Sequence, residues 1–168
     1  FDAADLRLNR RDLFRVDVAS GQSLRLTTEA TPLHVSPVFA DTGRRVGYLA
    51  STATTPLRVH ADDCAAQCDG AAISSAFDAT SITAMRSPQQ VTFKSADGLT
   101  IHAQLFDHGA ADSKRAAIVF VHGGPMRQML PAFHNMPYYH RDYAMNQYLA
   151  SRGFVVLSVN YRLGIGYG

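Results

Sequence analysis

The chain has 168 residues, a formal net charge of +2 and 46% hydrophobic residues, values that are ordinary for a globular protein of one domain or parts of two. Its arginines are scattered rather than gathered into a stripe, which argues against a nucleic-acid partner. No apolar run approaches the roughly 20 residues of a membrane-spanning helix, so no membrane partner is expected. The sequence begins with Phe1 and has no recognisable signal peptide, so we expect a processed chain or a fragment.

The first half predicts short strands separated by turns, because polar and apolar residues alternate there. The predicted strands are 13–18, 23–27, 45–50, 57–60 and 73–77, and residues 36–39 lead into the strand 45–50. The first two flank a turn at 19–22 and form a predicted hairpin. Strands at this spacing, with the turn at 41–43, are typical of four-stranded propeller blades; an unrelated antiparallel sheet is the alternative. A closed propeller needs at least four blades, so only part of one fits here.

Two cysteines, Cys64 and Cys68, lie four residues apart in a predicted loop. A zinc site would need two more ligands, and none stands nearby in the sequence. His134 and His140 likewise lack a carboxylate at matching spacing, so we expect no metal and no other cofactor. A local disulfide and two free thiols both stay open; a disulfide would favour an oxidising compartment.

The second half predicts a hairpin followed by a βαβ unit. Strands at 90–95 and 99–106 flank Asp97-Gly98, a strong hairpin signal. The apolar run 116–121 predicts a strand buried on both faces, and 153–162 predicts a second such strand. The segment between them predicts a helix at 142–152 that stops at Gly153.

The predicted helix has two faces of different character. One carries Ala144, Met145, Tyr148 and Leu149, and the other carries Asn146, Gln147 and Ser151. We therefore expect the apolar set to face the sheet, and we expect the crossover between the strands to be right-handed. A βαβ unit of another α/β fold, with glycines that serve only as turns, is the alternative.

Three motifs in order resemble the prolyl oligopeptidase family of serine peptidases, closest to its bacterial dipeptidyl-peptidase and acylaminoacyl-peptidase branches. They are Val91–Gly98, Val121-His122-Gly123-Gly124-Pro125, and Tyr148–Arg162 running into Gly166-Tyr167-Gly168. The resemblance implies a β-propeller over an α/β-hydrolase domain, with a mixed fold class. Residues 1–87 would then be the C-terminal portion of the propeller, and 88–168 the N-terminal portion of the catalytic domain.

The same resemblance implies cleavage of short peptides by a Ser-Asp-His triad. No serine here lies in the G-x-S-x-G turn that such enzymes use, so we expect the triad beyond residue 168 and no hydrolysis by the chain alone. Related bacterial enzymes and the cysteine pair favour a periplasmic or secreted protein, with the cytoplasm as the alternative. The expected partner is a peptide substrate, and the sequence is compatible with a homo-oligomer.

The remaining candidate site residues lie on the oxyanion side. The resemblance implies that the loop after the strand 116–121 helps hold the oxyanion, which makes Gly123 and Gly124 the first candidates and His122 a weaker one. For His122, bracing of the loop is the alternative role. Arg162 and Tyr161 are weak candidates for substrate binding, and a bracing role is the stronger prediction for Arg162.

The segment 126–140 is rich in Met, Phe, Tyr and His. It either lines the specificity pocket or packs against the propeller. For the whole chain, an α/β-hydrolase that acts on esters and a non-catalytic binding module are the alternatives to a peptidase.

Overall fold

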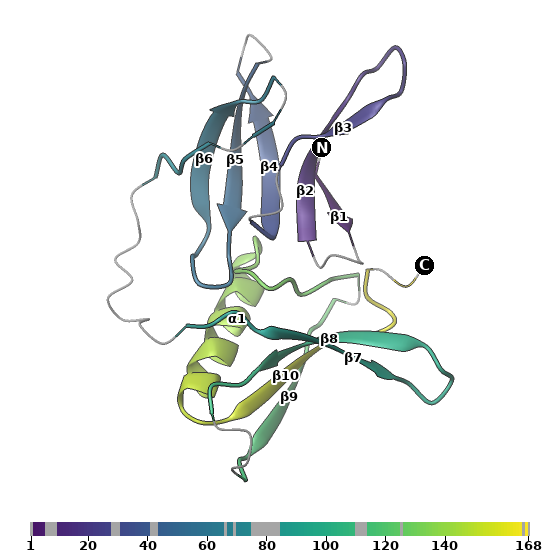
Figure 1. The fold of residues 1–168 in the computed structure, drawn as a ribbon, viewed down its shortest axis with the longest axis vertical. Coiled ribbons are helices and arrows are strands. Elements are labelled where there is room, and N and C mark those ends of the chain that lie inside the picture. Colours follow the sequence, from purple (N-terminus) through teal and green to yellow (C-terminus); the bar gives the residue numbers. More distant parts are fainter. Residues whose placement is uncertain are drawn as a thin grey trace.

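The computed structural model describes residues 2–5, 10–27, 31–40, 44–65, 67–68, 70–74, 85–109, 114–124, 126–165 and 167. Within these ranges the chain is mostly β-structure, with two sheets and one helix. Figure 1 shows the sheets one above the other, with the helix against the lower sheet. The predicted turn at 41–43 and Pro125 lie outside the described residues. The predicted strand at 73–77 lies partly outside them.

The first sheet has the order β1-β2-β4-β5-β6, with β3 paired to β2. Its strands are β1 (Asp2–Asp5), β2 (Arg10–Val16), β3 (Ser23–Arg25), β4 (Leu33–Phe39), β5 (Arg45–Ser51) and β6 (Arg58–Asp63). The hairpin between β2 and β3 is confirmed: the Asp17 carboxylate accepts the Ser20 N–H at 2.7 Å and closes the turn. The expectation of only antiparallel strands in the first half was wrong, because β2 pairs with β4 in parallel, through Arg11 and Leu33.

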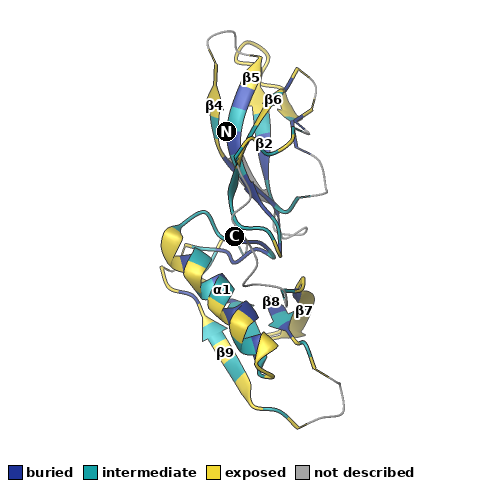
Figure 2. Cartoon of the chain, turned by 90° about the vertical axis from the view of Figure 1, so that its left-hand side faces the viewer, coloured by how far each residue is buried: buried dark blue, intermediate teal, exposed yellow. Residues whose placement is uncertain are grey.

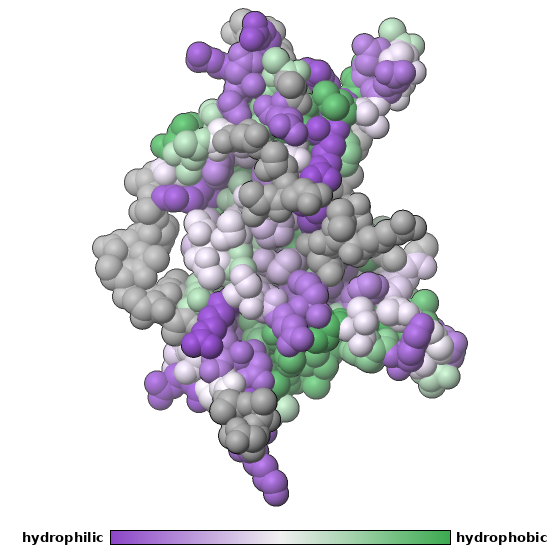
Figure 3. All heavy atoms as spheres, in the orientation of Figure 1, coloured by the Kyte–Doolittle hydropathy of each residue, from purple (hydrophilic) through white to green (hydrophobic). Residues whose placement is uncertain are grey.

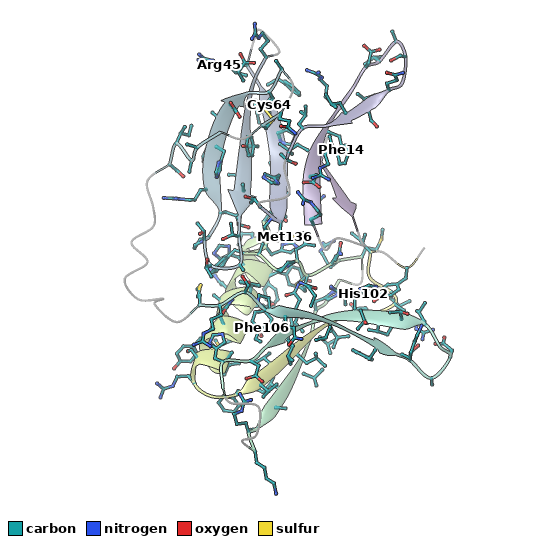
Figure 4. All side chains as sticks on the ribbon, viewed as in Figure 1. Phe14, Arg45, Cys64, His102, Phe106 and Met136 are labelled. Carbon is teal, nitrogen blue, oxygen red and sulfur yellow. A yellow bond between two sulfur atoms is a disulfide. The ribbon has the colours of Figure 1, made fainter. Side chains whose placement is uncertain are left out.

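One face of the first sheet carries a hydrophobic core that includes Leu13, Leu26 and Tyr48. Cys64 and Cys68 belong to this core and are joined by a disulfide (Figure 4). Their Cα atoms are 4.8 Å apart, a spacing that a disulfide can bridge. The structure therefore selects the disulfide over the free thiols.

The second sheet has the order β7-β8-β10-β9. Its strands are β7 (Gln89–Lys94), β8 (Thr100–Phe106), β9 (Ala117–Val121) and β10 (Val155–Asn160). The predicted hairpin between β7 and β8 is confirmed, with Gly98 at φ 85° in the turn. The parallel pairing of β9 with β10 across the helix α1 (Pro137–Ser151) confirms the βαβ unit.

The prediction that β9 is buried on both faces was wrong. The strand lies at the edge of the sheet, and the side chains of Val119 and Val121 are 63% and 61% exposed. Ile118 and Phe120 instead pack against the core under α1. Figure 2 shows the alternation along β9, and Figure 3 shows apolar surface in the same part of the sheet. The helix covers one face only, which is why an unbroken apolar run leaves half its side chains exposed.

The helix α1 begins five residues earlier than predicted, at Pro137, a residue whose fixed φ suits the first helical position. It ends at Ser151, one residue before the predicted end at 152, and Gly153, which was predicted to stop it, has φ 94°. There the Phe154 N–H donates to the Leu149 carbonyl and the Gly153 N–H donates to the Ala150 carbonyl, at 3.1 and 3.0 Å. These two bonds form a Schellman motif, which satisfies carbonyls that the helix end would otherwise leave without donors.

The predicted buried face of α1 was wrong in part. Asn146 and Gln147 are buried, whereas Met145 and Tyr148 are 54% and 58% exposed. Gln147 can be buried because its side-chain amide donates to the Arg86 carbonyl at 2.7 Å and accepts the Arg86 N–H at 3.2 Å.

The two sheets are joined by hydrogen bonds as well as by apolar contact. The Ser51 hydroxyl at the end of β5 donates to the Phe133 carbonyl at 2.6 Å, and the Tyr143 hydroxyl donates to the Ala53 carbonyl at 3.0 Å. Leu33 of β4 packs in one buried cluster with Leu130. The segment 126–136 therefore lies at the junction between the sheets.

Candidate functional site: a glycine loop at the end of β9

The peptide between Gly123 and Gly124, in the loop that follows β9, is held in one orientation. The Gly123 carbonyl accepts a hydrogen bond from the Tyr139 hydroxyl at 2.9 Å, and Tyr139 lies in the first turn of α1. In a trans peptide the carbonyl and the following N–H point in opposite directions, so the Gly124 N–H points away from Tyr139. Within the described part of the chain, no group accepts a hydrogen bond from the Gly124 N–H. The loop can therefore offer this donor to a ligand.

Gly124 can hardly be replaced at this point. Its φ of 106° lies where residues with a side chain are strained. A Cβ there would also stand 3.0 Å from Arg127 Cγ and 3.3 Å from the Tyr139 hydroxyl. At Gly123, by contrast, a Cβ would meet only the Tyr139 hydroxyl, at an ordinary 3.5 Å. The conformation of the loop thus depends on glycine at position 124 more than at 123.

His122 is buried and contacts the backbone of the loop. Its ring stacks on the ring of Tyr161, with centroids 4.4 Å apart. Burial lowers the pKa of His122, so the imidazole is neutral near pH 7. Its Nδ1 lies 3.2 Å from the Gly123 carbonyl oxygen, and in the tautomer that donates to this oxygen Nε2 carries no proton. This arrangement favours a bracing role for His122 over donation from Nε2.

Arg162 is held by the hairpin between β7 and β8. Its guanidinium forms two hydrogen bonds with the Asp97 carboxylate, at 2.5 and 2.9 Å, and one with the Ser95 hydroxyl at 3.0 Å. The contact lowers the pKa of Asp97, chiefly through the Arg162 hydrogen bonds. Arg162 therefore braces the loop after β10, while Tyr161, the other weak candidate, packs on His122.

Asn160 and Tyr139 position the candidate site, although no role was predicted for either residue. At the end of β10 the Asn160 side chain accepts the Met129 N–H at 2.7 Å and donates to the Met129 carbonyl at 3.0 Å. This pair of bonds anchors the segment after the glycine loop. A signal for Asn160 did exist, because a polar residue at the end of a buried strand has to find partners.

A cavity of about 370 Å³ lies beside the loop, between the two sheets. Residues 126–128, 130, 134–136 and 165 line it from one side, and Arg11 and Leu33 of the first sheet line it from the other. Figure 4 places Met136 in this region between the sheets. The segment 126–136 thus has both roles considered for it: Leu130 packs between the sheets, and neighbouring residues line a cavity.

Metal ligands and membrane-spanning helices can be assessed for the described residues. Among them, no three His, Cys, Asp or Glu side chains gather in a way that could hold a metal ion. No helix in the same ranges is both long and apolar enough to cross a bilayer.

No protein-family model and no curated protein sequence matches the chain. Solved structures do match over 95% of it. Puromycin hydrolase matches with a TM-score of 0.71 at 23% identity, and a second structure of puromycin hydrolase with 0.69 at 25%. A Mycobacterium tuberculosis puromycin-hydrolyzing peptidase matches with a TM-score of 0.70 at 20% identity, and Pyrococcus horikoshii acylaminoacyl peptidase with 0.68 at 23%.

The chain spans only 23–24% of the length of these proteins. The likeness shows that the chain shares the fold of part of several peptidases. The two sheets and the helix therefore occur together, in this arrangement, in proteins whose names describe hydrolysis of puromycin or of acylaminoacyl peptides.

Proposed function

We propose that the chain is part of a serine peptidase of the prolyl oligopeptidase family that cleaves short peptides. In this proposal residues 1–87 form the end of a β-propeller, and 88–168 begin an α/β-hydrolase domain. The Ser-Asp-His triad is supplied by residues beyond this sequence. The fold shared with solved peptidases supports the proposal, as do the three sequence motifs.

One observation carries the proposal: the Gly124 N–H lies after a strand in parallel pairing and is turned outward by the bond from Tyr139 to the Gly123 carbonyl. A peptide N–H held in this way costs no reorganisation when negative charge develops in front of it. The contribution of one such donor to transition-state stabilisation is about 2.7–4 kcal/mol.

The chemistry would follow from this geometry. The serine oxygen attacks the scissile carbonyl carbon, and the carbonyl oxygen becomes negatively charged as the new C–O bond forms. The Gly124 N–H donates to that oxygen, with the Gly123 N–H as the second candidate donor. The tetrahedral intermediate then breaks its C–N bond, and the leaving amine takes the proton that the serine gave to the catalytic histidine. His122 and Tyr139 take no proton in this scheme and only hold the loop.

The buried disulfide between Cys64 and Cys68 supports a periplasmic or secreted location as part of the proposal, because disulfides persist in oxidising compartments.

The test is hydrolysis by the full gene product that contains these residues. We expect it to cleave chromogenic anilides of short peptides, and to lose activity after treatment with a serine-directed phosphonate. Parallel assays with acyl-aminoacyl and dipeptidyl anilides would assign the branch. Turnover of nitrophenyl esters without turnover of any anilide would instead show an esterase, and the absence of both would contradict the proposal.

A further inference from the structure

The outer side of α1 carries a stripe of exposed side chains that takes no part in the candidate site. From the first turn of the helix to its C-cap, the stripe consists of Tyr138, Arg141, Met145, Tyr148 and Arg152. The intervals alternate between three and four residues, a spacing that places side chains on one face of a helix. Tyr138, Met145 and Tyr148 are 70%, 54% and 58% exposed, and both arginines are exposed as well. Figure 2 shows exposed residues along this helix.

The opposite side of α1 is packed against the rest of the chain. The buried residues of the helix are Tyr139, Tyr143, Asn146, Gln147 and Ala150. At 3.6 residues per turn, these five point away from the stripe, on the other side of the helix axis. The helix is therefore well anchored, and large apolar side chains gathered on its free face are typical of an interaction surface.

The stripe has the residue types that protein interfaces favour. Tyr, Met and Arg are enriched in interfaces, and Tyr and Arg often contribute most to binding. Neither Arg141 nor Arg152 forms an ion pair with another described residue. Asp142, the one acidic residue of α1, is half-buried and lies beside the stripe rather than in it. The stripe itself thus combines positive charge with aromatic rings and has no carboxylate.

The order of the residues makes the stripe complementary to itself. Met145 lies seven positions from both Tyr138 and Arg152. If a second copy of α1 lies antiparallel, with a two-fold axis at Met145, Tyr138 of one copy faces Arg152 of the other. Arg141 then faces Tyr148 of the other copy, to within one helical rise of about 1.5 Å. A guanidinium is attracted to the face of a tyrosine ring, so both kinds of contact are favourable.

We propose that two copies of the protein dimerise through this face of α1, with the helices antiparallel and Met145 at the two-fold axis. The interface is isologous, because each copy contributes the same residues to it. Parallel helices in register would instead place arginine opposite arginine. An acidic helix of another protein would pair with the arginines but would lack the match to the tyrosines. The inference goes beyond the proposed function and does not depend on any reaction.

The dimer should be weak. The stripe spans about 21 Å, the length of 14 helical rises. One pair of helices of this length buries less surface than the roughly 1,600 Å² of a standard interface, so we expect association in the micromolar range or above.

The first test is sedimentation equilibrium of the full gene product from about 10 µM to 1 mM, the range in which a small interface should form. We expect the mean mass to rise towards twice that of the monomer. Tyr148→Ala should weaken association at least tenfold, whereas Phe93→Ala, which truncates an exposed ring on β7, should leave it unchanged. A monomer at every concentration, or equal effects of the two substitutions, would overturn the proposal.

An exchange of partners tests the pairing itself. Tyr138→Arg places an arginine opposite Arg152 and should abolish the dimer. Adding Arg152→Tyr to this variant restores each pair with its members exchanged, so the double variant should dimerise again. Damage to the helix alone would not be rescued in this way; circular dichroism checks that both variants fold. Failure of the second substitution to restore association would contradict the antiparallel pairing.

Disulfide cross-linking tests the position of the axis. Met145→Cys faces its own copy and should form a covalent dimer on oxidation, with the parent protein as the blank. Tyr138→Cys is the matched control, because its two copies would lie about 21 Å apart along the helices, too far to be bridged. Cys64 and Cys68 are buried and bonded to each other, so they do not compete. Equal cross-linking of both variants would overturn the proposed register. None of these measurements needs hydrolysis, so their outcome is independent of the peptidase proposal.

Discussion

The Tyr139 hydroxyl donates to the Gly123 carbonyl oxygen at 2.9 Å, and this contact fixes the orientation of the peptide that joins the two glycines. The helix α1 holds the tyrosine, whose side chain is buried. The candidate oxyanion donor, the Gly124 N–H, is therefore oriented by a residue 15 positions further along the chain.

Tyr139→Phe should loosen the loop without unfolding the protein. It removes one neutral hydrogen bond, for which a loss of about 0.5–1.5 kcal/mol of stability is typical. Hydrogen exchange of the Gly124 amide should become faster, and in the active protein kcat should fall more than KM rises. The control is Tyr138→Phe, since Tyr138 is 70% exposed. Equal exchange rates in both variants would show that the hydroxyl does not orient the loop.

Gly124→Ala should destabilise the protein, whereas Gly123→Ala should not. At position 124 the positive φ and the approach to Arg127 both oppose a side chain. We expect a loss of about 1–3 kcal/mol in the free energy of unfolding, measured in urea. The same substitution at Gly123 meets an ordinary contact and is the matched control. If the two variants unfold at the same urea concentration, the loop conformation is not the one described.

Asp12→Asn should cost much more stability than Asp63→Asn. The buried Asp12 carboxylate accepts two hydrogen bonds from Arg10, both at 2.7 Å, and one from the Thr27 hydroxyl at 2.8 Å. The substitution breaks a buried ion pair with the Arg10 guanidinium, and breaking such a pair typically costs about 3–5 kcal/mol.

The control is the exposed pair of Asp63 and Arg44, which should contribute less than about 1 kcal/mol. Urea unfolding of the two variants side by side measures the difference. Similar losses in both would contradict the ranking by burial.

The stability of the protein should fall as the pH decreases from 6.5 towards 4. Burial is the main cause that lowers the pKa of His34 and of His134 to about 4 in the folded state, whereas unfolded histidine titrates near 6.5. Between these values the unfolded state binds more protons than the folded state, so acid favours unfolding. Above pH 6.5 both states hold neutral rings and the effect is absent.

The expected slope is at most about 1.4 kcal/mol per pH unit for each histidine. Urea unfolding between pH 6.5 and 5 measures it, in a range where few carboxylates titrate. His134→Asn should reduce the slope, because it removes one titrating ring. The variant should keep its local structure, since asparagine can still accept the Met136 N–H that now donates to His134 Nδ1. A flat profile in the parent protein would contradict the burial of both rings.

The hairpins and the βαβ unit could be predicted because their signals are local. Alternation across 90–106 and the Asp97-Gly98 turn determine one hairpin without reference to the rest of the chain. The end of α1 just before Gly153 is local in the same way, since glycine readily takes the positive φ that a Schellman motif needs.

The buried face of α1 could not be predicted, because its partners are distant in sequence. Gln147 is buried against Arg86 and Ala53, which lie 61 and 94 positions earlier. The same holds for the cavity, where Arg11 meets the segment 126–136 only after the sheets pack together. Exposure of Val119 and Val121 was also missed, because a strand's position in its sheet is not encoded in its own residues.

The most direct measurement of the central claim is kcat/KM for a peptide anilide with the full gene product and its Gly124→Ala variant, whose fold is checked by circular dichroism. A displaced oxyanion donor should reduce kcat/KM by about 10²–10³-fold, with most of the loss in kcat. An active parent whose Gly124→Ala variant is folded and equally fast would show that the glycine loop holds no oxyanion.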